Sequence, residues 1–86
     1  MKIEIRTFDL GTDEDKARKV CEEAMEFYAE HSCSRIAGIY PLMLEIGDVL
    51  TALANYCAAR GIDAQECIDL VETKNIIRGR YDTIEP

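Results

Sequence analysis

Four carboxylates stand out in the sequence because they form two pairs, each with its members three residues apart. Glu45 and Asp48 lie within the apolar run of residues 42–50, and Glu23 and Glu26 lie upstream at the same spacing. At about 100° per residue, residues three apart share one face of a helix. A buried carboxylate without a partner is costly, so something positive must meet it. The pattern predicts two acidic helix faces that come together.

Binding of a divalent cation is the chemistry that suits four such carboxylates. Carboxylate oxygens are hard ligands, which suit Mg²⁺ or Mn²⁺ better than zinc or copper. A di-iron bundle would need Glu-x-x-His motifs, and His31, the one histidine, does not complete one. Magnesium ions can bridge phosphate oxygens and lower the pKa of a bound water, so in-line displacement at a phosphate substrate is the expected reaction.

Basic and amide side chains gather near the end of the third expected helix. Lys74, Arg78 and Arg80 would contact phosphate oxygens, and Asn75 would orient the substrate or a metal ligand. A structural use of the same residues is the alternative. In that case the acidic pair of the second helix would form buried salt bridges with Lys74 or Arg78.

Three helices are expected to position these side chains, after a short strand or an extended arm in residues 1–10. Thr12 and Asp15 have the spacing of a capping box, so the first helix should begin there and run to about His31. Residues 32–40 contain Gly38 and small polar side chains, and are therefore expected to connect the first two helices.

The second helix should span about residues 41–60, with Pro41 in its first turn and Gly61 as its C-terminal cap. It is apolar nearly all round, which predicts a central element sandwiched between neighbours. Its polar residues Glu45, Asp48 and Asn55 would then be held inside the structure.

The third helix has a clear start at Asp63, which precedes a glutamate by three residues, and Gly79 should end it. Its stripe of Ala64, Cys67 and neighbouring apolar residues is expected to face the core, and the same face continues with the basic residues. The four cysteines include no Cys-x-x-Cys pair and are expected to be reduced thiols.

Size and charge limit the range of functions. A chain of 86 residues forms one domain and buries only roughly 60% of its unfolded surface. The excess of 17 acidic over 10 basic residues argues against binding to nucleic acid polymers or anionic membranes. No apolar run reaches the ~20 residues of a membrane span, and the N-terminus is charged rather than signal-like. A cytoplasmic protein is the expectation.

One copy leaves much apolar helix surface, so a partner is expected. The predicted fold is all-α, with three main helices that pair with those of a second chain into a four-helix-bundle core. A homodimer is the simplest assembly, and a tetramer is the alternative.

The segment Lys19–Phe27, followed by Glu45-Ile46-Gly47-Asp48-Val49-Leu50, resembles the MazG-like nucleoside triphosphate pyrophosphohydrolases. These all-α enzymes carry an ExxE pair on one helix and an ExxD pair on the next. Residues 74–81 also resemble the basic segment that closes the third helix of the family. The resemblance spans residues 16–81, so the whole chain, 1–86, would be one MazG-like helical domain.

This resemblance implies a Mg²⁺-dependent enzyme in which Glu23, Glu26, Glu45 and Asp48 hold the metal. Water would attack the α-phosphate of a nucleoside or deoxynucleoside triphosphate, releasing the monophosphate and pyrophosphate. Two other classes remain open: a non-enzymatic helical interaction module, and a degenerate family member that binds nucleotides without hydrolysing them.

Overall fold

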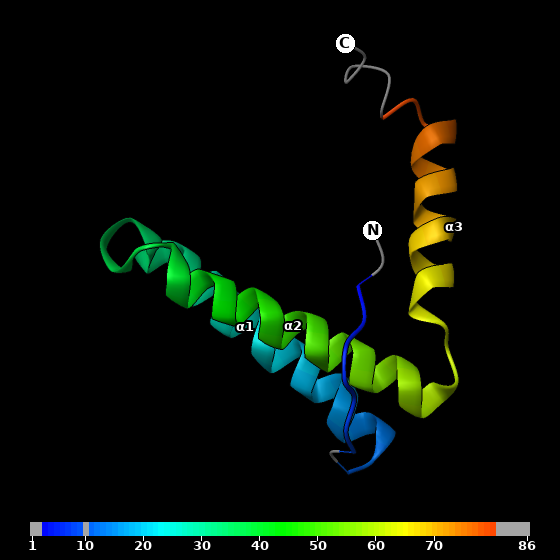
Figure 1. The fold of residues 1–86 in the computed structure, drawn as a ribbon, viewed down its shortest axis with the longest axis horizontal. Helices are drawn as coiled ribbons and strands as arrows, with labels where there is room; N and C mark the ends of the chain where they lie inside the picture. The colour runs from blue at the N-terminus through cyan, green and yellow to red at the C-terminus, as the bar shows by residue number, and fades with distance from the viewer. Residues whose placement is uncertain (1–2, 10, 81–86) are drawn as a thin grey trace.

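The protein is all-α, as the sequence predicts. The computed structural model describes residues 3–9 and 11–80, and within them it contains three helices and no strand. The helices are α1 (Asp13–Ala37), α2 (Ile39–Arg60) and α3 (Ala64–Ile77). Residues 3–9 form an arm without regular secondary structure, so the alternative of an N-terminal strand is wrong. In Figure 1 this arm crosses the hairpin formed by α1 and α2.

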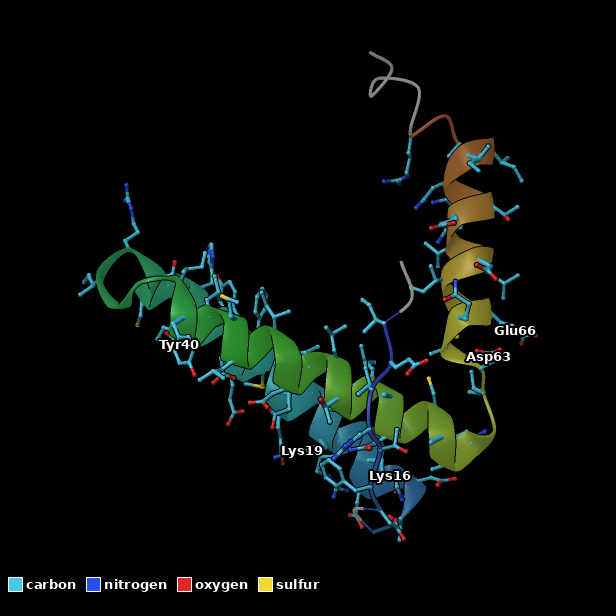
Figure 2. All side chains as sticks on the ribbon, in the orientation of Figure 1. Lys16, Lys19, Tyr40, Asp63 and Glu66 are labelled. Atoms are coloured by element: carbon cyan, nitrogen blue, oxygen red, sulfur yellow. The ribbon has the colours of Figure 1, made fainter. Side chains whose placement is uncertain are left out.

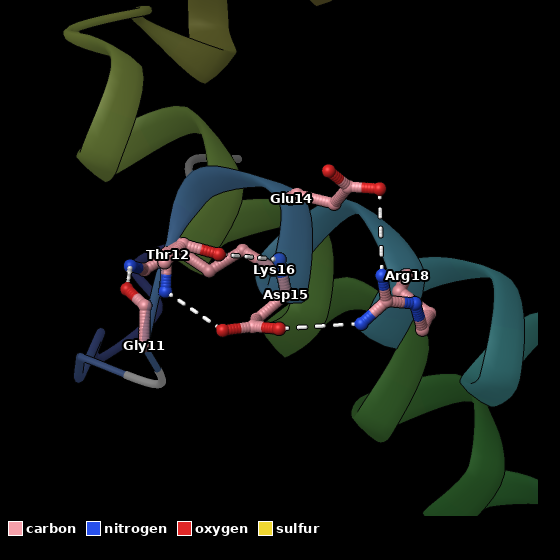
Figure 3. Close-up of polar contacts among 6 residues, drawn as sticks. All are labelled: Gly11, Thr12, Glu14, Asp15, Lys16 and Arg18. Atoms are coloured by element: carbon pink, nitrogen blue, oxygen red, sulfur yellow. Dashed lines mark hydrogen bonds and ion pairs between the residues drawn. The ribbon is translucent and has the colours of Figure 1, made fainter.

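A capping box starts α1, as its sequence predicts. The backbone N–H of Asp15 donates to the Thr12 hydroxyl at 3.1 Å, and the backbone N–H of Thr12 donates to the Asp15 carboxylate at 3.0 Å (Figure 3). Both bonds satisfy donors that have no partner within the helix. Arg18 then pairs with Asp15 at 3.2 Å, one turn further along.

The expected connection between the first two helices is wrong, because α1 continues to Ala37. The hydroxyls of Ser32 and Ser34 bond back to backbone carbonyls of the preceding turn, at 3.4 and 2.9 Å. These serines therefore satisfy their hydroxyls within the helix, which continues through them. Gly38 alone makes the turn, with φ of 87° and ψ of −175°, and serves as the cap of both helices.

Helices α1 and α2 pack side by side as an antiparallel hairpin (Figure 1). A row of mostly polar residues runs along the facing sides of the two helices. We call this row the polar seam. On each helix its members are separated by steps of three, four and three residues, which keeps them on one face. The seam consists of Lys16, Lys19, Glu23 and Glu26 on α1, and Glu45, Asp48, Ala52 and Asn55 on α2.

Burial in the single chain is concentrated on this seam. Among the residues whose exposure the structure describes, the buried ones are Lys16, Glu23, Ala52 and Asn55, and all four are seam residues. Large apolar side chains instead lie on the outside of the hairpin, where Met25 is 74% and Tyr40 is 69% exposed. In the single chain the fully buried positions of the hairpin are thus mostly polar and many large apolar side chains are exposed, unlike in a self-sufficient soluble domain.

Helix α3 stands away from the hairpin (Figure 1). Gly61, in the left-handed conformation with φ of 65°, ends α2, and the Asp63 carboxylate accepts the backbone N–H of Gln65 at 2.9 Å to start α3. Both boundaries agree with the sequence, although α3 ends at Ile77, two residues before Gly79. The apolar stripe expected to face the core is exposed in the single chain.

By length and composition, α2 is also long and apolar enough to cross a membrane, and little of it is buried in the single chain. The central helix of a soluble assembly has the same length and composition, so this property does not decide the location of the helix.

Candidate metal centre

Three of the four predicted ligands meet on the polar seam. Glu23 from α1 and Glu45 and Asp48 from α2 each offer a carboxylate oxygen, and these three oxygens lie within 4.8 Å of one another. Glu23 is buried, Glu45 is half-buried and Asp48 is exposed. The three-residue spacing on α2 places its two carboxylates one above the other, facing Glu23 across the hairpin.

Glu26, the fourth predicted ligand, is exposed and lies outside this three-carboxylate cluster. It shares a hydrogen bond with Glu23, one turn away on α1. That bond and the charge of Glu23 raise the pKa of Glu26 above its ordinary value. Glu26 therefore borders the cluster and holds its proton more tightly than a free glutamate.

Two carboxylate oxygens in the cluster have no hydrogen-bond partner. They are Oε2 of Glu23 and Oε2 of Glu45, and both are shielded from solvent. An ionised oxygen that loses water and gains no donor carries a desolvation cost. A cation placed between the two helices would remove that cost, because carboxylate oxygens from both sides would coordinate it.

The site carries more negative than positive charge. The Nζ of Lys19 lies 2.9 Å from Oε1 of Glu23, and this hydrogen bond holds the pKa of Glu23 below its ordinary value. Loss of solvent raises the pKa of Glu45, and the charges of Asp48 and Glu23 raise it further. One ammonium thus faces several carboxylates, and the excess is negative.

The donor set fits Mg²⁺ or Mn²⁺. All the cluster ligands are carboxylates from regular helices, and neither histidine nor cysteine belongs to the cluster. Magnesium is commonly bound through a few carboxylates and keeps water or phosphate oxygens as its remaining ligands. The exposed position of Asp48 leaves one side of the cluster open to such ligands.

The structure does not bring the predicted phosphate-binding residues to this cluster within one chain. Lys74 and Asn75 lie on α3, and Arg78 and Arg80 follow its last turns. Helix α3 projects away from the hairpin (Figure 1). Nor do the described residues include an ion pair between either acidic residue of α2 and these basic residues, as the structural alternative would require.

Three further seam residues, one at the site and two near it, have no site role in the sequence analysis. Lys19 contacts Glu23, and Lys16 is buried one turn before Lys19 on α1 (Figure 2). Asn55 is buried on α2, seven residues after Asp48. The sequence spacing could have indicated these positions. Lys16 precedes Glu23 by seven residues, and Asn55 follows Asp48 by seven. Seven residues are about two helical turns, so these residues had to share the faces of the acidic pairs.

Comparison of the chain with protein-family models, curated proteins and solved structures finds no match in any of the three.

Proposed function

We propose that the protein is a MazG-like, Mg²⁺-dependent nucleoside triphosphate pyrophosphohydrolase. One observation carries the proposal: Glu23, Glu45 and Asp48 converge from two helices with two shielded carboxylate oxygens left unpaired. A solvated acidic helix face would have its oxygens in water. The family resemblance, given by the ExxE and ExxD pairs and the basic segment, supplies the reaction.

The reaction is hydrolysis at the α-phosphate of an NTP or dNTP. Water adds to the α-phosphorus, the bond to the bridging oxygen of the β-phosphate breaks, and the products are the monophosphate and pyrophosphate. When bound, Mg²⁺ or Mn²⁺ supplies positive charge that stabilises the phosphate oxygens during displacement. The carboxylates of the cluster would hold the cation, and Glu26, one turn from Glu23 on α1, would border it.

The proposal includes a homodimer, with a tetramer as the larger form. Support comes from the exposed apolar faces of the hairpin and from a small apolar groove of about 170 Å³ lined by Phe27, Ile46, Val49 and Leu50. Pairing two hairpins would cover these faces and form a four-helix core. It would also allow α3 of one copy to carry its basic residues toward the carboxylates of the other.

We assign the assembly to the cytoplasm. Helix α2 carries Glu45 and Asp48 in its middle turns, and carboxylates are costly at the centre of a lipid bilayer. A partner copy gives the apolar faces of α2 a covering that leaves the acidic pair available to a metal and a nucleotide. The net charge of −7 disfavours an anionic membrane surface or a nucleic acid polymer as that partner.

Pyrophosphate release from a panel of ribo- and deoxynucleoside triphosphates, with Mg²⁺ and then Mn²⁺, tests the proposal. Glu45→Gln and Asp48→Asn should each lower kcat/KM at least about a hundredfold, because each removes a metal ligand. Glu72→Gln, an exposed carboxylate on α3, is the control with the same change of charge. The absence of turnover with every nucleotide, at concentrations where sedimentation shows the oligomer, would refute the enzyme assignment.

A non-enzymatic interaction module is the second candidate, and the ion pair between Lys19 and Glu23 favours it. In that case the acidic residues serve structure, and the apolar outer faces recruit another protein. This candidate predicts no rise in Tm with Mg²⁺ and no nucleotide binding. Nucleotide binding without pyrophosphate release would instead identify a degenerate relative of the enzymes.

A further inference from the structure

Two cysteine thiols meet where α3 leaves the end of α2. Cys57 lies in the last turn of α2, and Cys67 lies in the first turn of α3. The two thiols are hydrogen-bond partners, although Cys67 follows Cys57 by ten residues. Both are free thiols in the structure, which therefore represents the reduced form. Neither belongs to the polar seam or to the acidic cluster.

Backbone hydrogen bonds hold both cysteines to the connection between the helices. The carbonyl oxygen of Cys57 accepts the N–H of Ile62 at 2.9 Å, as part of the cap around Gly61. The N–H of Cys67 donates to the carbonyl oxygen of Asp63 at 3.3 Å, at the start of α3. Each cysteine is thus bonded to one end of this short connection, so the fold of the connection brings the two turns together.

Little else in the chain holds α3 in its direction. Helices α1 and α2 contact each other along the hairpin, whereas α3 makes few contacts with either of them. Figure 1 shows α3 leaving the end of α2 and projecting away from the hairpin. The direction of α3 therefore depends on the connection and on the contacts beside it. A covalent bond between the two thiols would fix that direction.

We propose that Cys57 and Cys67 form a reversible intramolecular disulfide that fixes α3 against the end of α2, with a small disulfide such as oxidised glutathione as the oxidant. The pair is a thiol–disulfide switch that acts on the direction of one helix. In a cytoplasm that keeps thiols reduced, the open form is the resting state, and oxidising conditions close it. This assignment does not depend on the proposed nucleotide-hydrolysing function.

The bond forms by two thiol–disulfide exchanges. The Cys67 thiolate attacks one sulfur of oxidised glutathione, and the first glutathione leaves as its thiolate. The Cys57 thiolate then attacks the sulfur of Cys67 in this mixed disulfide, and the second glutathione leaves. The two electrons lost by the protein thiols reduce one oxidised glutathione to two thiols.

The surroundings of the two thiols determine this order of attack. Cys67 is exposed and accessible to glutathione, whereas Cys57 is half-buried. Burial raises the pKa of the Cys57 thiol, and the neighbouring Cys67 raises it further. Once Cys67 is held in the mixed disulfide, its charge no longer opposes the ionisation of Cys57. The second attack is then intramolecular and needs no access from solvent.

Peptide mapping of the full-length protein tests the pairing, because trypsin separates the two cysteines. Cys57 falls in peptide 36–60, and Cys67 falls in peptide 61–74. After incubation with oxidised glutathione and alkylation of the remaining thiols, the monomeric fraction should contain these two peptides joined by a disulfide. No joined peptides, or either one joined instead to peptide 20–35 with the other two cysteines, would overturn the proposal.

The fold, and not only proximity in the sequence, should favour the bond. The equilibrium constant for exchange with glutathione should be at least about tenfold larger in native buffer than in urea, because the folded chain holds the thiols together. Equal constants in the two solutions would refute the contribution of the fold, and with it the proposed switch.

Hydrogen exchange tests whether the bond fixes α3. The backbone amides of residues 64–77 should exchange at least about tenfold more slowly in the oxidised protein, and dithiothreitol should reverse the change. Cys67→Ser should abolish this effect, whereas Cys33→Ser, at an exposed cysteine of α1, is the matched control and should retain it. Unchanged exchange in α3 of the disulfide-bonded protein would refute the switch.

Discussion

At the scale of single residues, Lys19 and the proposed metal would compete for Glu23. Lys19 lies 2.9 Å from Oε1, while Oε2 faces the cluster without a hydrogen bond. The ammonium keeps the buried carboxylate ionised and leaves one of its oxygens available to a metal. Lys19 also lies 3.7 Å from Glu22, so the lysine has an alternative partner on the same helix if a divalent cation claims Glu23.

Replacing Lys19 should therefore strengthen metal binding. Lys19→Met removes the competing cation, and the Mg²⁺ affinity measured by calorimetry should rise about two- to fivefold, the usual range for a partly exposed ion pair. Without metal the variant should be less stable, because Glu23 stays buried and loses its partner. Arg18→Met, the neighbouring residue, changes the net charge equally and is the control. A fall in Mg²⁺ affinity in Lys19→Met would contradict this competition.

At the scale of elements, the hairpin depends on a turn of one residue. Gly38 has φ of 87° and ψ of −175°, a conformation that residues with a Cβ almost never adopt. No atom lies within 4 Å of a Cβ built at this position, so the constraint comes from the backbone and not from a neighbour.

Gly38→Ala should lower the free energy of unfolding by about 1–3 kcal/mol, the usual cost of such a backbone conformation. Chemical denaturation measures the change. A protein assembled by chemical ligation with D-alanine at this position is the control, because a D-residue adopts positive φ without strain. Equal loss of stability in both proteins would show that the methyl group, and not the backbone, is responsible.

The sequence predicted the helix starts better than the packing of the helices. Thr12 with Asp15, and Asp63, act through hydrogen bonds within a few residues, so local spacing was sufficient to place α1 and α3. The end of α1 was missed because serines near Gly38 resembled a loop, whereas their hydroxyls bond to the helix backbone.

The candidate site was predicted in part for a similar reason. The spacing of the acidic pairs placed Glu23, Glu45 and Asp48 together, because each pair lies on one helix face. Asn55 was expected to be held inside, but its partner is the backbone N–H of Phe8, 47 residues away in the chain. A contact between residues so far apart in the chain cannot be predicted from local sequence patterns. Helix α3 makes few contacts with the other helices of the same chain, so no packing pattern in the sequence could place its basic residues.

At the scale of the whole molecule, the cluster makes stability depend on pH and metal. The pKa of Glu26 is raised by its bond to Glu23, and that of Glu45 by loss of solvent, so both groups bind protons more tightly in the folded chain. An ordinary glutamate has a pKa of 4.5. The stability that Glu26 and Glu45 contribute is therefore full below this pH and is lost as the pH rises through their pKa values in the folded chain. Glu23, with a lowered pKa, acts in the opposite sense, and its contribution is lost as pH falls below 4.5.

The rise in Tm caused by Mg²⁺ should thus be larger at pH 7 than at pH 4.5, because the cation relieves repulsion that exists only when the carboxylates are ionised. Thermal unfolding in both buffers, with and without Mg²⁺, measures the difference. Glu45→Gln should reduce the effect at pH 7. A rise of equal size at the two pH values would show that Mg²⁺ acts elsewhere.

The one-residue turn at Gly38 also limits how the chain can change in length during evolution. One residue inserted between Glu26 and Gly38 would rotate the earlier part of α1 by about 100° relative to α2 and would separate the acidic pairs. Two helical turns added to both helices, seven residues on each side of the glycine, would restore their alignment. Functional homologues should therefore differ here by matched insertions, and unmatched insertions should occur only outside the seam.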